Sequence, residues 1–67
     1  MDWVSAVSKA VEYIEEHITD DIGVNDVAAE IHISPFYFQK GFSLLCGITV
    51  AEYIRNRRLA LAGIELA

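Results

Sequence analysis

The side chains with the greatest capacity for chemistry lie in the segment 34–47, SPFYFQKGFSLLCG. Gln39 and Lys40 are adjacent there. An amide and an amine are side chains that hydrogen-bond base edges in a DNA major groove, Gln to adenine and Lys to guanine. Phe36 and Ser43 recur on the same face at helical spacing. The segment therefore has the composition of a helix that reads DNA, or of an ordinary amphipathic helix that resembles one.

Local signals mark both ends of this helix. Ser34 can cap the first turn through its hydroxyl, and Pro35 suits the first helical position because its missing N–H is not needed there. Gly47 tolerates the left-handed backbone of a helix C-cap. These marks predict a helix over residues 35–46. Its expected apolar stripe is Phe38, Phe42 and Leu45.

A second helix is predicted just before this one, over residues 24–31. Gly23 stands at its N-cap, and Asp26 can accept from the cap in a capping arrangement. Only residues 32–34 separate the two helices. Two helices joined by so short a turn cross at a large angle, which is the geometry of a helix-turn-helix. The residues expected to face inward are Val27, Ala28 and Ile31.

Two further helices flank this pair, over residues 2–17 and 50–62. Thr49 and Glu52 have the spacing of a capping box at the start of the later one. The expected fold is therefore all-α: one domain over residues 1–67, with about four helices and a homeodomain-like helix-turn-helix. The apolar stripe expected in the first helix is Val4, Val7, Val11, Ile14 and Ile18. The last helix is expected to contact the core through Tyr53, Ile54 and Leu59, and the position of Trp3 stays open.

The net charge of −5 is distributed unevenly along the chain. Residues 1–33 hold one lysine and eight acids, whereas residues 34–58 hold four cations and one acid. Positive charge thus falls where phosphate contacts with DNA would be needed. One arginine is expected to pair with an acid from the first two helices, Asp26 and Glu30 being the candidates. The expected base contacts are Phe36, Gln39 and Lys40, and the expected phosphate contacts are Tyr37, Ser43, Arg55, Arg57 and Arg58.

Two of these residues have a second interpretation. Phe36 either touches a thymine methyl group or a sugar, or packs against the first helix. Tyr37 either donates a hydrogen bond to a phosphate or is half buried by packing.

Other chemistries find little support. Cys46 is the only cysteine, so the chain has no internal disulfide, and we expect its side chain to be buried or half buried. His17 and His32 are too isolated for a zinc site. The sequence has no membrane-spanning run, no leader and no catalytic arrangement. We expect a cytoplasmic protein that is not an enzyme and needs no cofactor or metal.

The succession YIEEHITDDIGVNDVAAEIHISPFYFQKGFSLLCGITVAEYIRNRRLALA resembles the first half of the DNA-binding domain of AraC/XylS-family transcription regulators. The resemblance covers about residues 7–62, and its most specific parts are SPFYFQKGF and EYIRNRRL. It implies a first helix-turn-helix unit followed by a linker helix, with double-stranded DNA as partner and a second unit absent here. It also places Phe36, Gln39 and Lys40 at groove-facing positions. The chain departs from the family where Ser43 and Leu44 replace residues that are often basic.

A rival hypothesis is a protein-interaction module. The acidic first two helices and the apolar end LALAGIELA, residues 59–67, are surfaces for a partner. RNA polymerase, a sensor domain, a second helix-turn-helix unit or a second copy of the chain are the partners considered.

Overall fold

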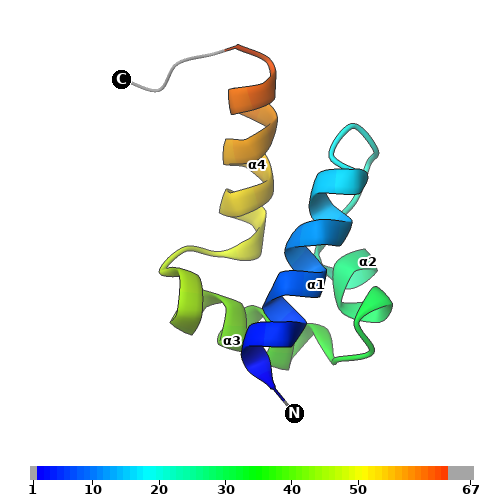
Figure 1. Cartoon of the computed structure of the whole chain (residues 1–67), viewed down its shortest axis with the longest axis vertical. Helices are drawn as coiled ribbons and strands as arrows, with labels where there is room; N and C mark the ends of the chain where they lie inside the picture. Colours follow the sequence, from blue (N-terminus) through cyan, green and yellow to red (C-terminus); the bar gives the residue numbers. More distant parts are fainter. Residues whose placement is uncertain (1, 64–67) are drawn as a thin grey trace.

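The computed structural model describes residues 2–63, which form four helices and no strand (Figure 1). The helices are α1 (Trp3–Glu16), α2 (Val24–Glu30), α3 (Pro35–Cys46) and α4 (Val50–Leu61). Each predicted helix is present, and its ends lie within one residue of the predicted ones. The all-α fold with a helix-turn-helix is therefore confirmed.

The predicted end signals are all used. The Ser34 hydroxyl accepts from the Tyr37 backbone N–H at 3.3 Å, so it caps α3. Gly47 ends that helix in the left-handed region, with φ of 78°. Thr49 and Glu52 each accept from the other's backbone N–H at 3.1 Å, which completes the capping box of α4.

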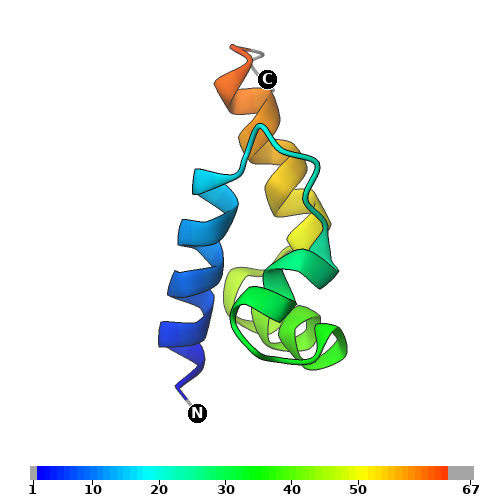
Figure 2. The same ribbon diagram turned by 90° about the vertical axis from the view of Figure 1, so that its right-hand side faces the viewer.

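The helix-turn-helix consists of α2, the turn 31–34 and α3. His32 adopts a left-handed backbone with φ of 59°, and the Ile33 N–H donates to the Ala28 carbonyl at 3.0 Å. These features reverse the chain tightly enough for α2 to pack on α3. Figures 1 and 2 show α3 running across one end of the molecule, with α1 and α4 extending away from it.

A single core lies where the four helices meet. Phe38 and Phe42 of α3 are completely buried, and their rings meet edge to face with centroids 5.8 Å apart. Residues from the other three helices surround them: Ala10, Ile14, Val27, Ala28, Val50 and Ile54. Helix α3 is thus anchored through two aromatic side chains. Their burial is among the largest single contributions to stability in so small a domain.

Two predicted core residues are exposed, so those predictions are wrong. Val4 is 66% exposed and Leu45 is 53% exposed. The rest of the predicted stripe of α1 faces the core: Ile14 and Ile18 are buried, Val7 and Val11 pack against the core, and Ala6 and Ala10 are buried beside them. Leu45 lies in the last turn of α3, beyond the core.

Within residues 2–63, no helix is both long enough and apolar enough to cross a membrane.

Candidate nucleic-acid interface

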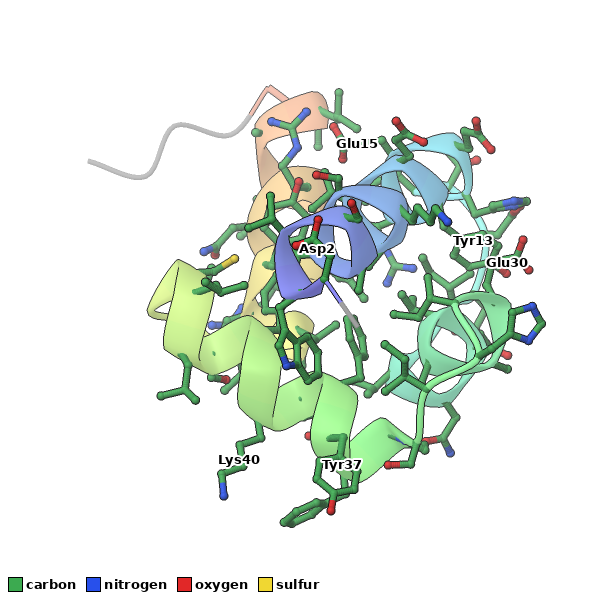
Figure 3. The ribbon with its side chains drawn as sticks, turned by 60° about the horizontal axis from the view of Figure 1, so that its bottom comes forward. Asp2, Tyr13, Glu15, Glu30, Tyr37 and Lys40 are labelled. Atoms are coloured by element: carbon green, nitrogen blue, oxygen red, sulfur yellow. The ribbon has the colours of Figure 1, made fainter. Side chains whose placement is uncertain are left out.

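One face of α3 points away from the rest of the molecule. Phe36, Gln39 and Lys40 are exposed and Ser43 is half buried, and these four side chains line one shallow depression of about 360 Å³. Figure 3 shows Lys40 and Tyr37 projecting from this side of α3, away from the core. The sequence spacing therefore predicted correctly which residues share the outward face. We call these four residues the α3 outward face.

The packing alternatives for the two aromatic residues are wrong. Phe36 is 70% exposed and Tyr37 is 63% exposed, so Phe36 is not packed against α1 and Tyr37 is not half buried. Their rings meet edge to face with centroids 5.8 Å apart.

The predicted ion pair between an arginine and an acid of the first two helices is present, but the acid is Glu15. Arg57 donates to Glu15 of α1 through Nε at 3.0 Å and through Nη2 at 2.6 Å, and these bonds raise the pKa of the Arg57 guanidinium. The candidates Asp26 and Glu30 are therefore wrong. The Asp26 carboxylate instead accepts from the Gly23 backbone N–H at 2.9 Å and caps α2.

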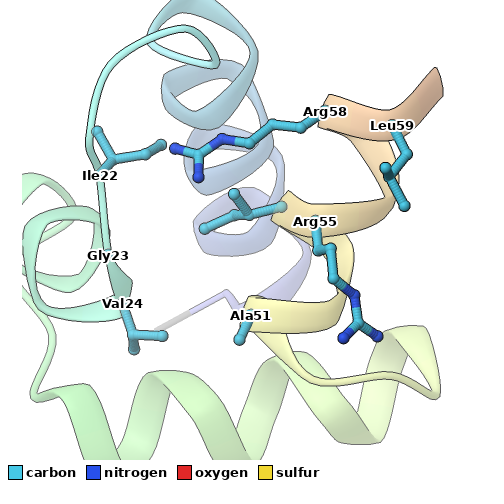
Figure 4. A pocket seen from close by; sticks show the side chains of 8 residues that line it. Ile22, Gly23, Val24, Ala51, Arg55, Arg58 and Leu59 are labelled. Carbon is cyan, nitrogen blue, oxygen red and sulfur yellow. The ribbon is translucent and has the colours of Figure 1, made fainter. Parts of the chain in front are cut away.

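Arg58 is also bound within the chain. Its Nε donates to the Ile18 carbonyl at 3.1 Å, and its Nη2 donates to the Asp20 carbonyl at 2.6 Å. Figure 4 shows the side chain reaching from α4 toward the loop between α1 and α2. Arg58 thus fastens α4 to that loop, and its guanidinium points away from α3.

Arg55 differs from these two arginines. It is exposed, and its side chain makes no hydrogen bond to any residue within 2–63. It lines an open cleft of about 270 Å³ between α4 and the start of α2, together with Gly23 and Val24 (Figure 4). Fewer arginines are therefore available for phosphate contacts than the sequence predicted, because Arg57 and Arg58 are hydrogen-bonded to other residues of the chain.

Glu15, Ile18 and Asp20 were not predicted as partners of the arginines. The only available signal was the position of Glu15 off the apolar stripe of the first helix, and this is shared by other acids. The expectation of a buried Cys46 is also wrong, because the residue is exposed. Among residues 2–63, no three His, Cys, Asp or Glu side chains gather as they would around a metal ion.

The fold and this face define a helix-turn-helix protein. The sequence model of the family described as bacterial regulatory helix-turn-helix proteins, AraC family, matches residues 14–55. That span includes the helix-turn-helix and the capping box of α4. The chain therefore belongs to the AraC family, and it is a DNA-binding domain of a transcription regulator.

Curated relatives agree with this assignment. The regulatory protein SoxS of Salmonella typhimurium is 38% identical over 60 residues, which are 90% of this chain and 56% of SoxS. The regulatory protein PocR of the same organism is 36% identical over 58 residues, 87% of this chain and 19% of PocR. YbfP of Bacillus subtilis, an uncharacterized HTH-type transcriptional regulator, is 38% identical over 66 residues, 98% of this chain and 22% of YbfP.

The chain thus spans about half the length of SoxS and about a fifth of PocR and YbfP. No solved structure matches it.

Proposed function

We propose that the chain reads DNA sequence by placing the α3 outward face in the major groove. Gln39 would hydrogen-bond an adenine edge, Lys40 a guanine edge, and Phe36 would contact a thymine methyl group. The observation that carries this proposal is the joint projection of these side chains from a helix whose opposite side is locked into the core by Phe38 and Phe42.

Phosphate contacts would fix the register of this helix on the duplex. Tyr37 and Ser43 flank the base-reading residues, and Arg55 is the arginine that makes no side-chain hydrogen bond within residues 2–63 and so can reach a phosphate. We assign Arg57 and Arg58 to holding α4 in place, because Arg57 donates to Glu15 and Arg58 donates to the Asp20 carbonyl. Binding would therefore involve few cations and would be weak for this chain alone, since phosphate attraction dominates non-specific affinity.

The chain would form the first of two helix-turn-helix units, with α4 as the linker helix toward the second. This part of the proposal is supported by the greater length of the relatives. A protein that acts on DNA in this way would be cytoplasmic.

Base reading is tested by selecting duplexes bound by the chain from a random pool and then replacing single base pairs in the selected site. Gln39→Ala should relax the preference at one base pair and Lys40→Ala at another, by about 1–3 kcal/mol each. Asn56→Ala is the matched control, because Asn56 is an exposed amide on α4. A selection that yields no preferred sequence, or a Gln39→Ala profile identical to that of wild type, would refute the proposal.

Association with RNA polymerase or with a second copy of the chain remains a separate proposal. Leu61, near the end of α4, is 60% exposed, which favours an apolar contact there. The remainder of the predicted apolar end, residues 64–67, lies outside the described residues. Sedimentation equilibrium of wild type and Leu61→Ser tests the dimer: a monomer at all concentrations would contradict it.

A further inference from the structure

Gly41 lies at the middle of α3, on the side opposite the outward face, and it is buried. A Cβ atom placed on Gly41 would lie 2.5 Å from Cζ3 of Trp3 and 2.7 Å from Cε3 and Cη2. Real Cβ atoms essentially never come this close to another heavy atom. The indole of Trp3, the first residue of α1, therefore occupies the space that a side chain at Gly41 would fill.

A glycine inside a helix needs such a reason. Relative to alanine it weakens a helix interior by about 1 kcal/mol, because its backbone loses more freedom on folding. Gly41 has a helical backbone and not the left-handed one seen at Gly47, so conformation does not require glycine here. Close approach of the Trp3 ring does require it.

We propose that Trp3 is a positioning residue for DNA reading, and that its ring on Gly41 sets the rotation of α3 about its own axis. This inference rests on the proposed function. Gly41 directly follows Lys40, so the ring contacts the backbone behind the base-reading pair. The core holds α3 through Phe38 and Phe42, but Leu44, Leu45 and Cys46 beyond them are exposed. Trp3 therefore contacts the backbone of α3 between its two core residues, Phe38 and Phe42, on the side opposite the base-reading pair.

Small rotations of α3 would matter for base contacts. A side-chain atom about 6 Å from the axis of a helix moves by about 1.5 Å when the helix rotates by about 15°. A hydrogen bond to a base edge does not survive such a displacement, because donor and acceptor must stay within about 3.2 Å. Attraction to phosphates changes little over the same distance, since it declines over a Debye length of about 8–10 Å. Loss of the Trp3 contact should thus impair specific binding and spare non-specific binding.

The experiment measures the ratio of affinities for a duplex selected by the wild-type chain and for a scrambled duplex of equal length. Trp3→Ala, which removes the ring, and Gly41→Ala, which displaces it, should each lower this ratio by about fivefold or more, the equivalent of one base contact. Affinity for the scrambled duplex should stay within about twofold of wild type, because it reports phosphate attraction. Val4→Ala is the matched control, since Val4 is the neighbour of Trp3 and is 66% exposed.

Far-UV circular dichroism at the assay temperature identifies the variants that are folded. A folded Trp3→Ala or Gly41→Ala chain with the wild-type ratio would overturn the inference. If both variants are unfolded, Trp3→Phe is measured, because the smaller ring keeps part of the contact with Gly41. A lowered ratio of specific to non-specific affinity would support the positioning role of Trp3, and an unchanged ratio would overturn it. Failure of the proposed function is distinguishable, because the wild-type chain itself would then bind both duplexes equally.

Discussion

Because of the contact between Trp3 and Gly41, we expect that replacing Gly41 by alanine lowers the stability of the chain. Gly→Ala replacements inside helices normally stabilise a protein, by about 1 kcal/mol at exposed positions. At Gly41 the new Cβ would meet three ring atoms of Trp3 at 2.5–2.7 Å. Carbon atoms prefer separations of about 3.5–4.0 Å, so the ring must move by about 1 Å or more.

The two effects oppose each other, and their sizes decide the sign. Overpacking a buried contact costs about 1–3 kcal/mol, and a clash with three ring atoms belongs at the upper end of that range. After subtracting the gain in helix propensity, Gly41→Ala should destabilise the chain by about 1–2 kcal/mol. For a domain of this size the melting temperature should fall by about 5–15 °C.

Thermal unfolding followed by far-UV circular dichroism measures this change. Trp3 is the only tryptophan, so its emission should also shift to the red in Gly41→Ala as the ring becomes more exposed. In a Trp3→Ala background the clash is absent, and Gly41→Ala should then stabilise the chain by about 1 kcal/mol. A melting temperature of Gly41→Ala equal to or above that of wild type, or the same effect in both backgrounds, would refute the reasoning.

Three further predictions concern α3 and α4. Arg58→Ala should lower the free energy of unfolding in urea by about 1–2 kcal/mol, because two charge-assisted hydrogen bonds to the α1–α2 loop are lost. Arg55→Ala is the control and should change that free energy by less than about 0.5 kcal/mol. Gly47→Ala should lower the free energy of unfolding by about 1 kcal/mol in the same assay, because Gly47 has a left-handed backbone with φ of 78°. No atom lies within 4 Å of an added Cβ, so backbone strain is the only expected contribution. The hydrogen bonds from Thr49 hold the pKa of the Glu52 carboxyl below its ordinary value of 4.5. The ionised carboxylate therefore stabilises the fold fully above pH 4.5, and this stabilisation is lost as the pH falls through the lowered pKa. Wild type should accordingly lose more stability than Glu52→Gln between about pH 5 and pH 3, and equal losses would contradict this assignment.

The helices themselves were predictable because their end signals are local. Ser34, Gly47 and the Thr49–Glu52 pair act on backbone groups within four residues, so their spacing in the sequence is enough to identify them. The α3 outward face was predictable for a similar reason, since helical periodicity alone determines which side chains lie together.

Contacts between distant segments were not predictable in this way. Arg57 and Glu15 are 42 residues apart, and several acids in the first two helices were equally plausible partners. Trp3 and Gly41 are likewise far apart, and neither residue indicates the other by type. Val4 and Leu45 fit an apolar stripe by their spacing, but they lie in the first turn of α1 and the last turn of α3 and are exposed.

The central claim is that DNA binds to the α3 outward face, and a salt titration of DNA binding tests it most directly. Binding of the selected duplex by wild type, Lys40→Ala and Lys9→Ala is measured at several salt concentrations. Lys9→Ala removes the same charge from α1, so it controls for net charge. Lys40, in the groove, and Arg55, at a phosphate, are the two cations that the proposal places on the duplex, so the logarithm of affinity should fall with the logarithm of salt with a slope of about −2. Lys40→Ala should weaken binding and reduce that slope by about one, while Lys9→Ala should leave both nearly unchanged. Equal effects of the two substitutions, or binding that does not depend on salt, would contradict the account.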